Sequence, residues 1–324
     1  MLSNSAHDQE PRPQLSVTPR VMHRAKLCFF ATRPMFLTAS ILPVLLGSVW
    51  GWKIAGGFDG AAFVLALLST ALVHAGANVL NDVYDDAIGS DRLNTGRIYP
   101  YTGGSRFIQN RVLSAQEMRT LGIGLLMAGF AIGLPLIALK GVAVLGFGLI
   151  GLLLAVAYSK PPLRLSDRGM GEIAVGIAFG VLPVCGSAWL QAGAVDLNTF
   201  LLSLPVSCWV TNILLINEIP DAEADAIAGR RNWVVRFGTG TAGAVFLVLN
   251  GSAAAAALWL AVFGPVSGLI AVGPLLLLGL AWKASRLLAG PTADRLSAIK
   301  STLAIHAIGS LWLIGVVLLS GQGL

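Results

Sequence analysis

The sequence predicts an all-α integral membrane protein with about nine transmembrane helices. Of its 324 residues, 55% are apolar and 12% are charged, about half the charged fraction of an average soluble protein. The mean hydropathy is +0.76. A membrane-spanning helix needs roughly 17–25 apolar residues, and nine runs approach or reach this length. They cover residues 34–52, 61–81, 120–139, 141–159, 171–191, 199–218, 241–263, 267–282 and 302–320.

The distribution of basic residues supports nine spans and predicts their orientation. When successive loops are assigned alternately to the two sides of the membrane, 20 of the 22 Lys and Arg residues fall on one side. Only Lys53 and Lys140 lie on the other side. Because cytoplasmic loops are enriched in Lys and Arg, we expect the N-terminus and the basic loops in the cytoplasm, with the protein in a bacterial-type inner or cell membrane. The net charge of +6 thus reflects topology, and no nucleic-acid partner is expected.

The domain organisation is simple. Residues 1–30 are predicted to be a polar cytoplasmic tail, without the apolar region of a signal peptide. Residues 31–324 are predicted to form one transmembrane domain, with cytoplasmic cap loops at about 86–118 and 219–240. The cysteines Cys28, Cys185 and Cys208 show neither a disulfide framework nor metal-ligand spacing, so we expect them to be packing residues.

An acidic cluster follows the second apolar run. Four polar residues there recur at i, i+3, i+4 and i+7 and share one helical face: Asn78, Asn81, Asp82 and Asp85. Asp91 follows. Like charges at this spacing repel each other, whereas a divalent cation would turn the repulsion into attraction. Oxygen ligands favour Mg²⁺, which takes one or two carboxylates plus substrate phosphates. A solvated helix end is the alternative interpretation of this cluster alone.

A second acidic cluster ends the sixth apolar run, on the same predicted side of the membrane. Asn217, Asp221 and Asp225 recur at i, i+4 and i+8, again on one helical face. The two clusters are four helices apart, which indicates a pseudo-repeat of four plus four helices with one left over. Helix bundles build metal and cofactor sites from facing helices, so the pair indicates a site more strongly than either cluster alone.

The loop after Asp91 is rich in Gly, Arg and Tyr. Gly103 and Gly104 are suited to turning backbone N–H groups toward an anion, although a plain flexible loop has the same composition. Together with the arginines of this loop they predict a phosphate-facing cap over the first acidic cluster; these are Arg97, Arg106 and Arg111.

Three polar residues at or within the predicted spans have two interpretations each. Arg33 opens the first span and is either a basic residue of the membrane interface or an anion contact. His74 is an intramembrane ionisable residue, but interhelical hydrogen bonding is its more frequent role, so no chemistry is assigned. Tyr158 is either an aromatic anchor at the membrane interface or part of a site.

The two clusters together resemble the Asp-rich signatures of the UbiA superfamily of intramembrane prenyltransferases. The matching residues are Asn81-Asp82-x-x-Asp85 with Asp91, and Asn217-x-x-x-Asp221-x-x-x-Asp225-x-x-x-Gly229. The stretches NDVYDDAIGSD, GGSR…IQNRVLS and DAEADAIAGRRNWVVRFG are most similar to the 1,4-dihydroxy-2-naphthoate polyprenyltransferases of menaquinone synthesis. Two positions depart from the pattern: Gly89 stands where many members have an aspartate, which Asp91 is expected to replace, and Pro220 stands where relatives often have a basic or polar residue.

The resemblance implies a UbiA-like bundle that transfers a polyprenyl group from an allylic polyprenyl diphosphate to an aromatic acceptor within the membrane lipid. The acceptor it implies is 1,4-dihydroxy-2-naphthoate. It implies Mg²⁺ as cofactor, with five metal-binding and catalytic residues: Asp82, Asp85, Asp91, Asp221 and Asp225. Further residues are expected to contact the diphosphate, namely Arg33, Asn78, Asn81, Arg106, Lys160, Arg164 and Asn217.

Other functions remain open at this point. 4-Hydroxybenzoate, homogentisate, haem or a chlorin would satisfy the same physical requirements as a naphthoate. A cation-binding membrane transporter is the competing class of protein. A transporter site is expected near the middle of the membrane, whereas the carboxylates here gather at the predicted cytoplasmic ends of the helices, which favours the enzyme.

Overall fold

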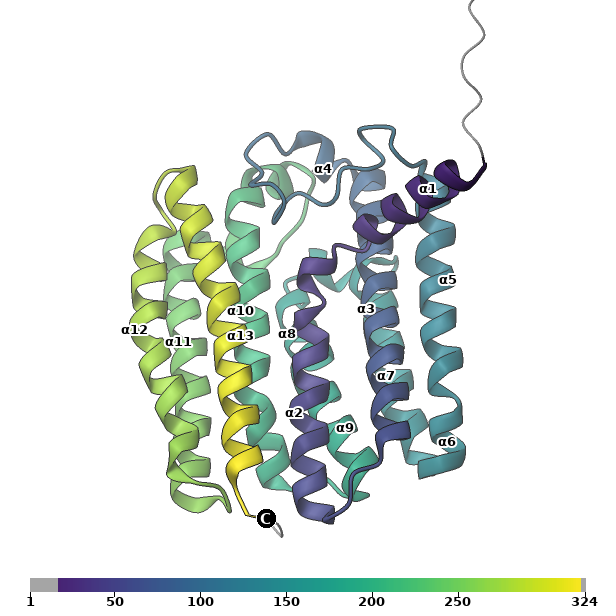
Figure 1. Cartoon of the computed structure of the whole chain (residues 1–324). Coiled ribbons are helices and arrows are strands. Elements are labelled where there is room, and N and C mark those ends of the chain that lie inside the picture. The colour runs from purple at the N-terminus through teal and green to yellow at the C-terminus, as the bar shows by residue number, and fades with distance from the viewer. Residues whose placement is uncertain (1–16, 322–324) are drawn as a thin grey trace, which may run out of the picture.

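The structure is a computed structural model that describes residues 17–321 of the chain. Within this part every regular element is helical, which confirms the predicted all-α class. The long helices run up and down through a bundle, and the polar loops gather at one end, called here the loop end (Figure 1). The C-terminal helix finishes at the opposite end.

The structure agrees approximately with the nine expected membrane spans. Eight segments are long and apolar enough to cross a membrane, and the helix Ala143–Ser159 adds a shorter apolar one of 17 residues. The eight are Pro34–Ala55, Gly60–Ile88, Ala115–Lys140, Gly171–Ala192, Leu197–Ile227, Trp233–Phe263, Gly268–Leu287 and Thr292–Leu319.

The first half of the chain contributes α1 to α7. Helix α1 (Val17–Ala31) lies at the loop end, outside the bundle (Figure 1), where Arg24 pairs with Glu117. The rest of this half consists of η1 (Pro34–Phe36), α2 (Thr38–Ala55), α3 (Gly60–Ile88), α4 (Ser90–Leu93), α5 (Ala115–Gly133), α6 (Pro135–Lys140) and α7 (Ala143–Ser159). The predicted tail, residues 1–30, therefore includes most of a helix, and its residues 1–16 lie outside the described part.

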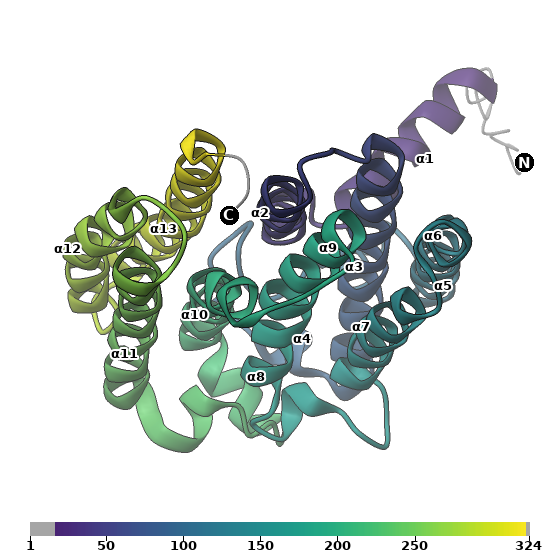
Figure 2. The same ribbon diagram turned by 90° about the horizontal axis from the view of Figure 1, so that it is seen from below.

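The second half begins with the short turn η2 (Leu165–Asp167). The elements that follow are α8 (Gly171–Gly176), the π-helical turn η3 (Ile177–Val181), α9 (Leu182–Ala192), α10 (Leu197–Ile227), α11 (Trp233–Phe263), η4 (Gly268–Ala271), α12 (Val272–Leu287) and α13 (Thr292–Leu319). Seen along the bundle, α2, α9 and α10 lie between α11–α13 on one side and α3 with α5–α7 on the other (Figure 2).

The helices that carry the acidic clusters extend beyond their apolar runs. Helix α3 continues to Ile88, where Gly89 ends it with a φ of 83°, a conformation that glycine adopts without strain. Helix α10 continues to Ile227, and α11 begins at Trp233 because the side chain of Asn232 accepts the Val235 N–H at 2.9 Å. Residues 228–232 connect the two helices, and a break at Gly238 (φ 79°, ψ 162°) separates the first residues of α11 from its main length, so the expected cap segment at 219–240 contains helix ends as well as a loop. Hydropathy detects only the apolar part of each helix, and both helices continue beyond it into polar sequence.

Close helix contacts hold the centre of the bundle together. Helices α2 and α9 are neighbours, and a Cβ added at Gly47 would lie 2.1 Å from the backbone oxygen of Val184. Small residues allow such approach between membrane helices. The indole N–H of the buried Trp50 donates to Thr199 at 2.8 Å, which joins α2 to α10. Cys28, Cys185 and Cys208 are free thiols.

Candidate active site

Two cavities meet at the loop end of the bundle. The larger one, about 320 Å³, is an apolar chamber lined mainly by α3, α7, α9 and α10, with further residues from α2, α5, α6, α8 and η3. The smaller one, about 100 Å³, is lined mainly by polar side chains, with the carboxylates of both acidic clusters among them. Five residues line both cavities and form the junction between them: Arg33, Asn81, Tyr158, Leu214 and Asn217. A molecule with a charged head and an apolar tail fits this pair of spaces.

The first acidic cluster is held by the loop that the sequence predicts as a cap. Asp82 accepts the backbone N–H of Ser105 at 2.9 Å, and Asp91 accepts from Gln109 at 3.2 Å. Gly104 lies between these aspartates with a φ of +66°, and a Cβ there would be 2.8 Å from a carboxylate oxygen of Asp91 and 3.0 Å from one of Asp82. Only glycine fits this position without moving a carboxylate.

The second acidic cluster is held by the same loop. Asp221 accepts from the side chain of Asn94 at 2.6 Å and from the backbone N–H of Gly103 at 3.0 Å. Asp225 accepts from Asn232 at 2.9 Å. The cap loop thus spans both clusters, and its N–H groups point at carboxylates in this structure. This refines the expectation of a phosphate-facing cap.

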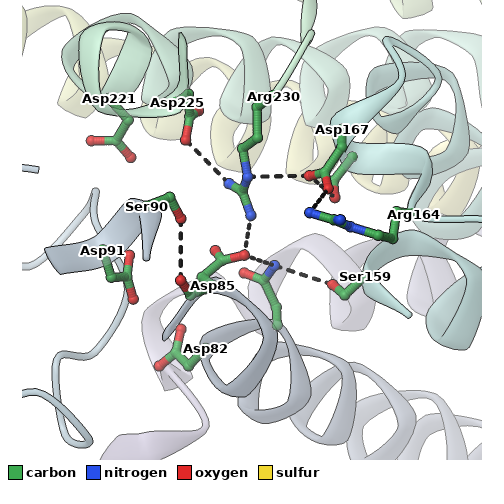
Figure 3. A network of polar contacts seen from close by, with 12 residues as sticks. Asp82, Asp85, Ser90, Asp91, Ser159, Arg164, Asp167, Asp221, Asp225 and Arg230 are labelled. Carbon is green, nitrogen blue, oxygen red and sulfur yellow. Dashed lines mark hydrogen bonds and ion pairs between the residues drawn. The ribbon is translucent and has the colours of Figure 1, made fainter. Parts of the chain in front are cut away.

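Arg230 lies at the centre of the site (Figure 3). Its guanidinium pairs with Asp85, approaches Asp225 at 3.3 Å and approaches Asp167 at 3.2 Å. Burial by itself would lower the pKa of Arg230, but the charges of its three carboxylate partners outweigh burial and raise the pKa above its ordinary value. The guanidinium is therefore a permanent cation that joins α3, α10 and the turn η2. Sequence reasoning missed this residue, although its place five residues after Asp225 was a usable signal.

Several buried oxygen atoms of the site have no hydrogen-bond partner in the described chain. Burial raises the pKa of the Asp91 carboxyl to about 8, and the charges of Asp85 and Asp82 add to the increase. Oδ1 of Asp82, Oδ1 of Asn217 and Oε2 of Glu218 are buried and have no hydrogen-bond partner among the described residues. These oxygen donors fit a hard divalent cation. In residues 17–321 no three His, Cys, Asp or Glu side chains are arranged as a group that could hold a metal ion by themselves.

Three of the expected diphosphate contacts lie at the junction of the two cavities. Arg33 donates to the backbone oxygen of Tyr101 at 3.1 Å and lies 3.9 Å from Asp82. Its φ of 55° is uncommon for a residue other than glycine, and its Nε is buried without a partner in the described chain. Asn81 and Asn217 also line both cavities.

The other expected diphosphate contacts do not line the polar cavity. Asn78 lines only the apolar chamber and donates to the backbone oxygen of Thr32 at 3.0 Å. Arg106 donates to the backbone oxygen of Asn94 within the cap loop. Lys160 is exposed, because the chain leaves α7 in an extended conformation and turns at the following Pro-Pro pair. Arg164 pairs with Asp167 instead (Figure 3).

Two residues outside the predicted set belong to the site by position. Tyr158 lines both cavities and therefore lies within the site. Glu218 lines the polar cavity one turn before Asp221. His74, in contrast, contacts Ser40 at 2.5 Å between α3 and α2, as expected for an interhelical hydrogen bond.

This multi-pass helix bundle, with two acidic helix ends at the mouth of an apolar chamber, is built like a membrane-embedded enzyme for an amphipathic anionic substrate. The model of the UbiA prenyltransferase family matches residues 40–318, and the chain belongs to this family. It is therefore a prenyltransferase and a multi-pass membrane protein.

Similar proteins include several that are named as naphthoate prenyltransferases. The chain is 31% identical over 225 residues to 1,4-dihydroxy-2-naphthoate octaprenyltransferase of Haemophilus influenzae. The aligned region covers 67% of this chain and 71% of the relative. It is 28% identical over 269 residues to the Bacillus subtilis protein of the same name, with 82% and 80% covered. It is 29% identical to 2-carboxy-1,4-naphthoquinone phytyltransferase of Synechocystis, with 66% and 67% covered.

Solved structures show the same fold. A UbiA homolog from Archaeoglobus fulgidus bound to DMAPP and Mg²⁺ superposes with a TM-score of 0.60 at 19% identity, covering 88% of this chain and 98% of that chain. A UbiA homolog from Aeropyrum pernix gives a TM-score of 0.60 at 20% identity, with 86% and 96% covered.

Proposed function

We propose that this protein transfers a polyprenyl group from an allylic polyprenyl diphosphate to 1,4-dihydroxy-2-naphthoate, with Mg²⁺ as cofactor. The junction between the two cavities carries the proposal. The polar cavity is suited to a diphosphate and the chamber to a prenyl chain, so the allylic carbon would lie near the five shared residues. The names of the relatives support the naphthoate as acceptor.

The carboxylates of the two clusters are the proposed metal-binding residues. Asp85, Asp91, Asp221 and Asp225 line the polar cavity, and Asp82 lies beside them with one free oxygen. When bound, Mg²⁺ would neutralise charge on the diphosphate and so make it a better leaving group. Arg33 adds a fixed positive charge at the junction, where the diphosphate meets the prenyl chain.

The proposed reaction balances without an added reactant. The allylic C–O bond breaks, and its electron pair leaves on the diphosphate oxygen. The ring carbon that bears the carboxylate forms the new C–C bond, and the bond to the carboxylate carbon then breaks. Its electron pair returns to the ring as carbon dioxide departs. The apolar walls of the chamber keep water away from the allylic cation.

The test is the mass of the product. Purified protein with Mg²⁺, one labelled polyprenyl diphosphate and a panel of aromatic acceptors should yield a prenylated naphthol without the carboxyl group. Prenylated 4-hydroxybenzoate that keeps its carboxyl group, without turnover of the naphthoate, would show that the acceptor is wrong and the family chemistry right.

The proposed orientation places the loop end in the cytoplasm. It is supported by the 20 of 22 Lys and Arg residues assigned to that side. At the opposite end, Lys140 pairs with Asp59 at 2.7 Å and Lys53 donates to the backbone oxygen of Ser320 at 2.8 Å. Alkaline phosphatase fused after Leu324 should be active, because the C-terminus is expected outside the cytoplasm. An inactive fusion would show that the proposed orientation is wrong.

A further inference from the structure

The apolar chamber has a limited length. On α7 its wall extends from Tyr158 at the junction to Val144 in the first turn of the helix, a length of about 21 Å at the rise of an α-helix. A geranyl chain fits within this length, whereas an extended octaprenyl chain exceeds it. A prenyl chain of the longer kind therefore needs a way out of the chamber.

Packing closes the chamber at its far end and along the seam between α3 and α5. At the far end, Ala66, Leu136 and Leu190 line the chamber and are buried in one apolar cluster. Along the seam, the hydroxyl of Ser69 donates to the backbone oxygen of Gly129 at 2.8 Å. The two helices are in backbone contact there, because a Cβ added at Gly129 would lie 2.9 Å from the backbone oxygen of Ser69.

The seam between α7 and α9 is filled by an aromatic ring. Phe147 on α7 lies so close to α9 that a Cβ added at Gly186 would be 3.4 Å from its ring. The ring of Trp189, one turn further along α9, has its centroid 6.4 Å from that of Phe147. A prenyl chain cannot pass between the two helices at this level.

The side of the chamber between α5 and α7 is open. Gly148 on α7 and Leu134 at the end of α5 both line the chamber and are both exposed. Helix α7 lies at the edge of the bundle beside α5 and α6 (Figure 2), and Ser159 is its only buried residue. The surface beside the opening is apolar, since Met127 on α5 is 62% exposed and Leu153 on α7 is 66% exposed. The opening therefore faces the hydrocarbon of the membrane.

We propose that the prenyl chain leaves the chamber between α5 and α7, and that Gly148 admits long chains because it places no side chain in this opening. This inference rests on the proposed function, which places the diphosphate in the polar cavity and the prenyl chain in the chamber. A Cβ added at Gly148 meets no atom within 4 Å, so the space beside it is free. Gly148 is thus a specificity-determining residue for the length of the prenyl donor.

The experiment compares a short and a long probe with the same head group. These are the unreactive thiolodiphosphate analogues of geranyl diphosphate and octaprenyl diphosphate. Equilibrium binding of each is measured with Mg²⁺ to the full-length protein in lipid nanodiscs, so that lipid and not detergent borders the opening. The wild type should bind both probes.

A bulky side chain at Gly148 should discriminate between the probes. Gly148→Phe fills the opening, and forcing a prenyl chain past the ring carries the cost of overpacking, so this variant should bind the octaprenyl probe about tenfold or more weakly. Its affinity for the geranyl probe should stay within about threefold of the wild type, a difference well below that cost.

The matched control is Gly146→Phe. Gly146 lies on the same helix, is exposed and also has open space at its Cβ, but it does not line the chamber. Gly146→Phe should bind both probes like the wild type. Both variants should keep the Tm of the wild type, because neither new side chain enters packed protein.

The remaining outcomes each count against the inference. Gly148→Phe that binds both probes like the wild type would show that the chain leaves elsewhere. Equal weakening of both probes, or the same loss of the octaprenyl probe in Gly146→Phe, would show that the effect is not one of chain length at this opening. A wild type that binds neither probe would overturn the proposed diphosphate site as well. A wrong aromatic acceptor would leave every result unchanged, since the assay contains none.

Discussion

The guanidinium of Arg230 and the carboxylate of Asp85 form an ion pair that joins the two acidic clusters. The two residues are 145 positions apart in the chain. Asp225 and Asp167 complete the group around the guanidinium at 3.3 and 3.2 Å. Without a bound metal, Arg230 is thus the cation that keeps buried carboxylates of α3 and α10 close together, in the place where the proposed function requires Mg²⁺ and a diphosphate.

Removing this cation should destabilise the site and increase its response to metal. Arg230→Gln removes the only cationic partner of Asp85 and Asp225 among the described ion pairs, while Asp167 keeps Arg164, and breaking a buried ion pair typically costs about 3–5 kcal/mol. We expect a lower Tm for this variant, and a larger increase of Tm on adding Mg²⁺ than in the wild type. Arg231→Gln is the control, because Arg231 is exposed. Equal Tm values for both variants would show that the Arg230 network contributes nothing.

Each acidic cluster should be needed for catalysis. Asp85→Ala and Asp221→Ala should each reduce kcat/KM by orders of magnitude, because each removes a proposed ligand of the metal and diphosphate. Both variants should remain folded, since Arg230 keeps two other carboxylate partners in the first and all three in the second. A variant with the rate of the wild type would identify its cluster as an ordinary helix end.

Gly104 should not tolerate a side chain. Gly104→Ala adds a Cβ that would lie 2.8 Å from Asp91 and 3.0 Å from Asp82, at a φ of +66°. Strain of about 1–3 kcal/mol is typical for such a backbone conformation in other residues. We expect a lower Tm and a higher half-saturating Mg²⁺ concentration in the turnover assay. Gly124→Ala on α5, where a Cβ meets open space, should change neither quantity.

Binding of Mg²⁺ should depend on pH through Asp91. Its carboxyl has a pKa of about 8 because it is buried near Asp85 and Asp82, and a carboxyl must lose its proton to bind a metal ion. Below pH 8 the protonated form competes with the metal, so the half-saturating Mg²⁺ concentration should fall as the pH rises from 6 to 8 and then level off. Asp91→Asn should weaken binding and flatten this dependence. An unchanged pH profile in that variant would show that another group titrates.

Hydropathy and helical periodicity predict much of this architecture. The nine apolar runs and the shared faces of Asp82 with Asp85 and of Asp221 with Asp225 follow from local spacing alone. The convergence of distant residues does not. Nothing in the spacing shows that Arg230 forms an ion pair with Asp85, or that Arg164 forms an ion pair with Asp167. Helix ends beyond the apolar runs are set by caps such as Asn232, which hydropathy does not detect.

The most direct test of the account is equilibrium binding of an unreactive prenyl thiolodiphosphate as Mg²⁺ is titrated. The paired clusters are proposed to bind the diphosphate through the metal, so binding should be lost in excess EDTA and restored by Mg²⁺. Asp85→Ala and Asp221→Ala should each weaken the restored binding at least tenfold, while Glu223→Gln should not. Tight binding in EDTA that neither aspartate variant weakens would contradict the central claim.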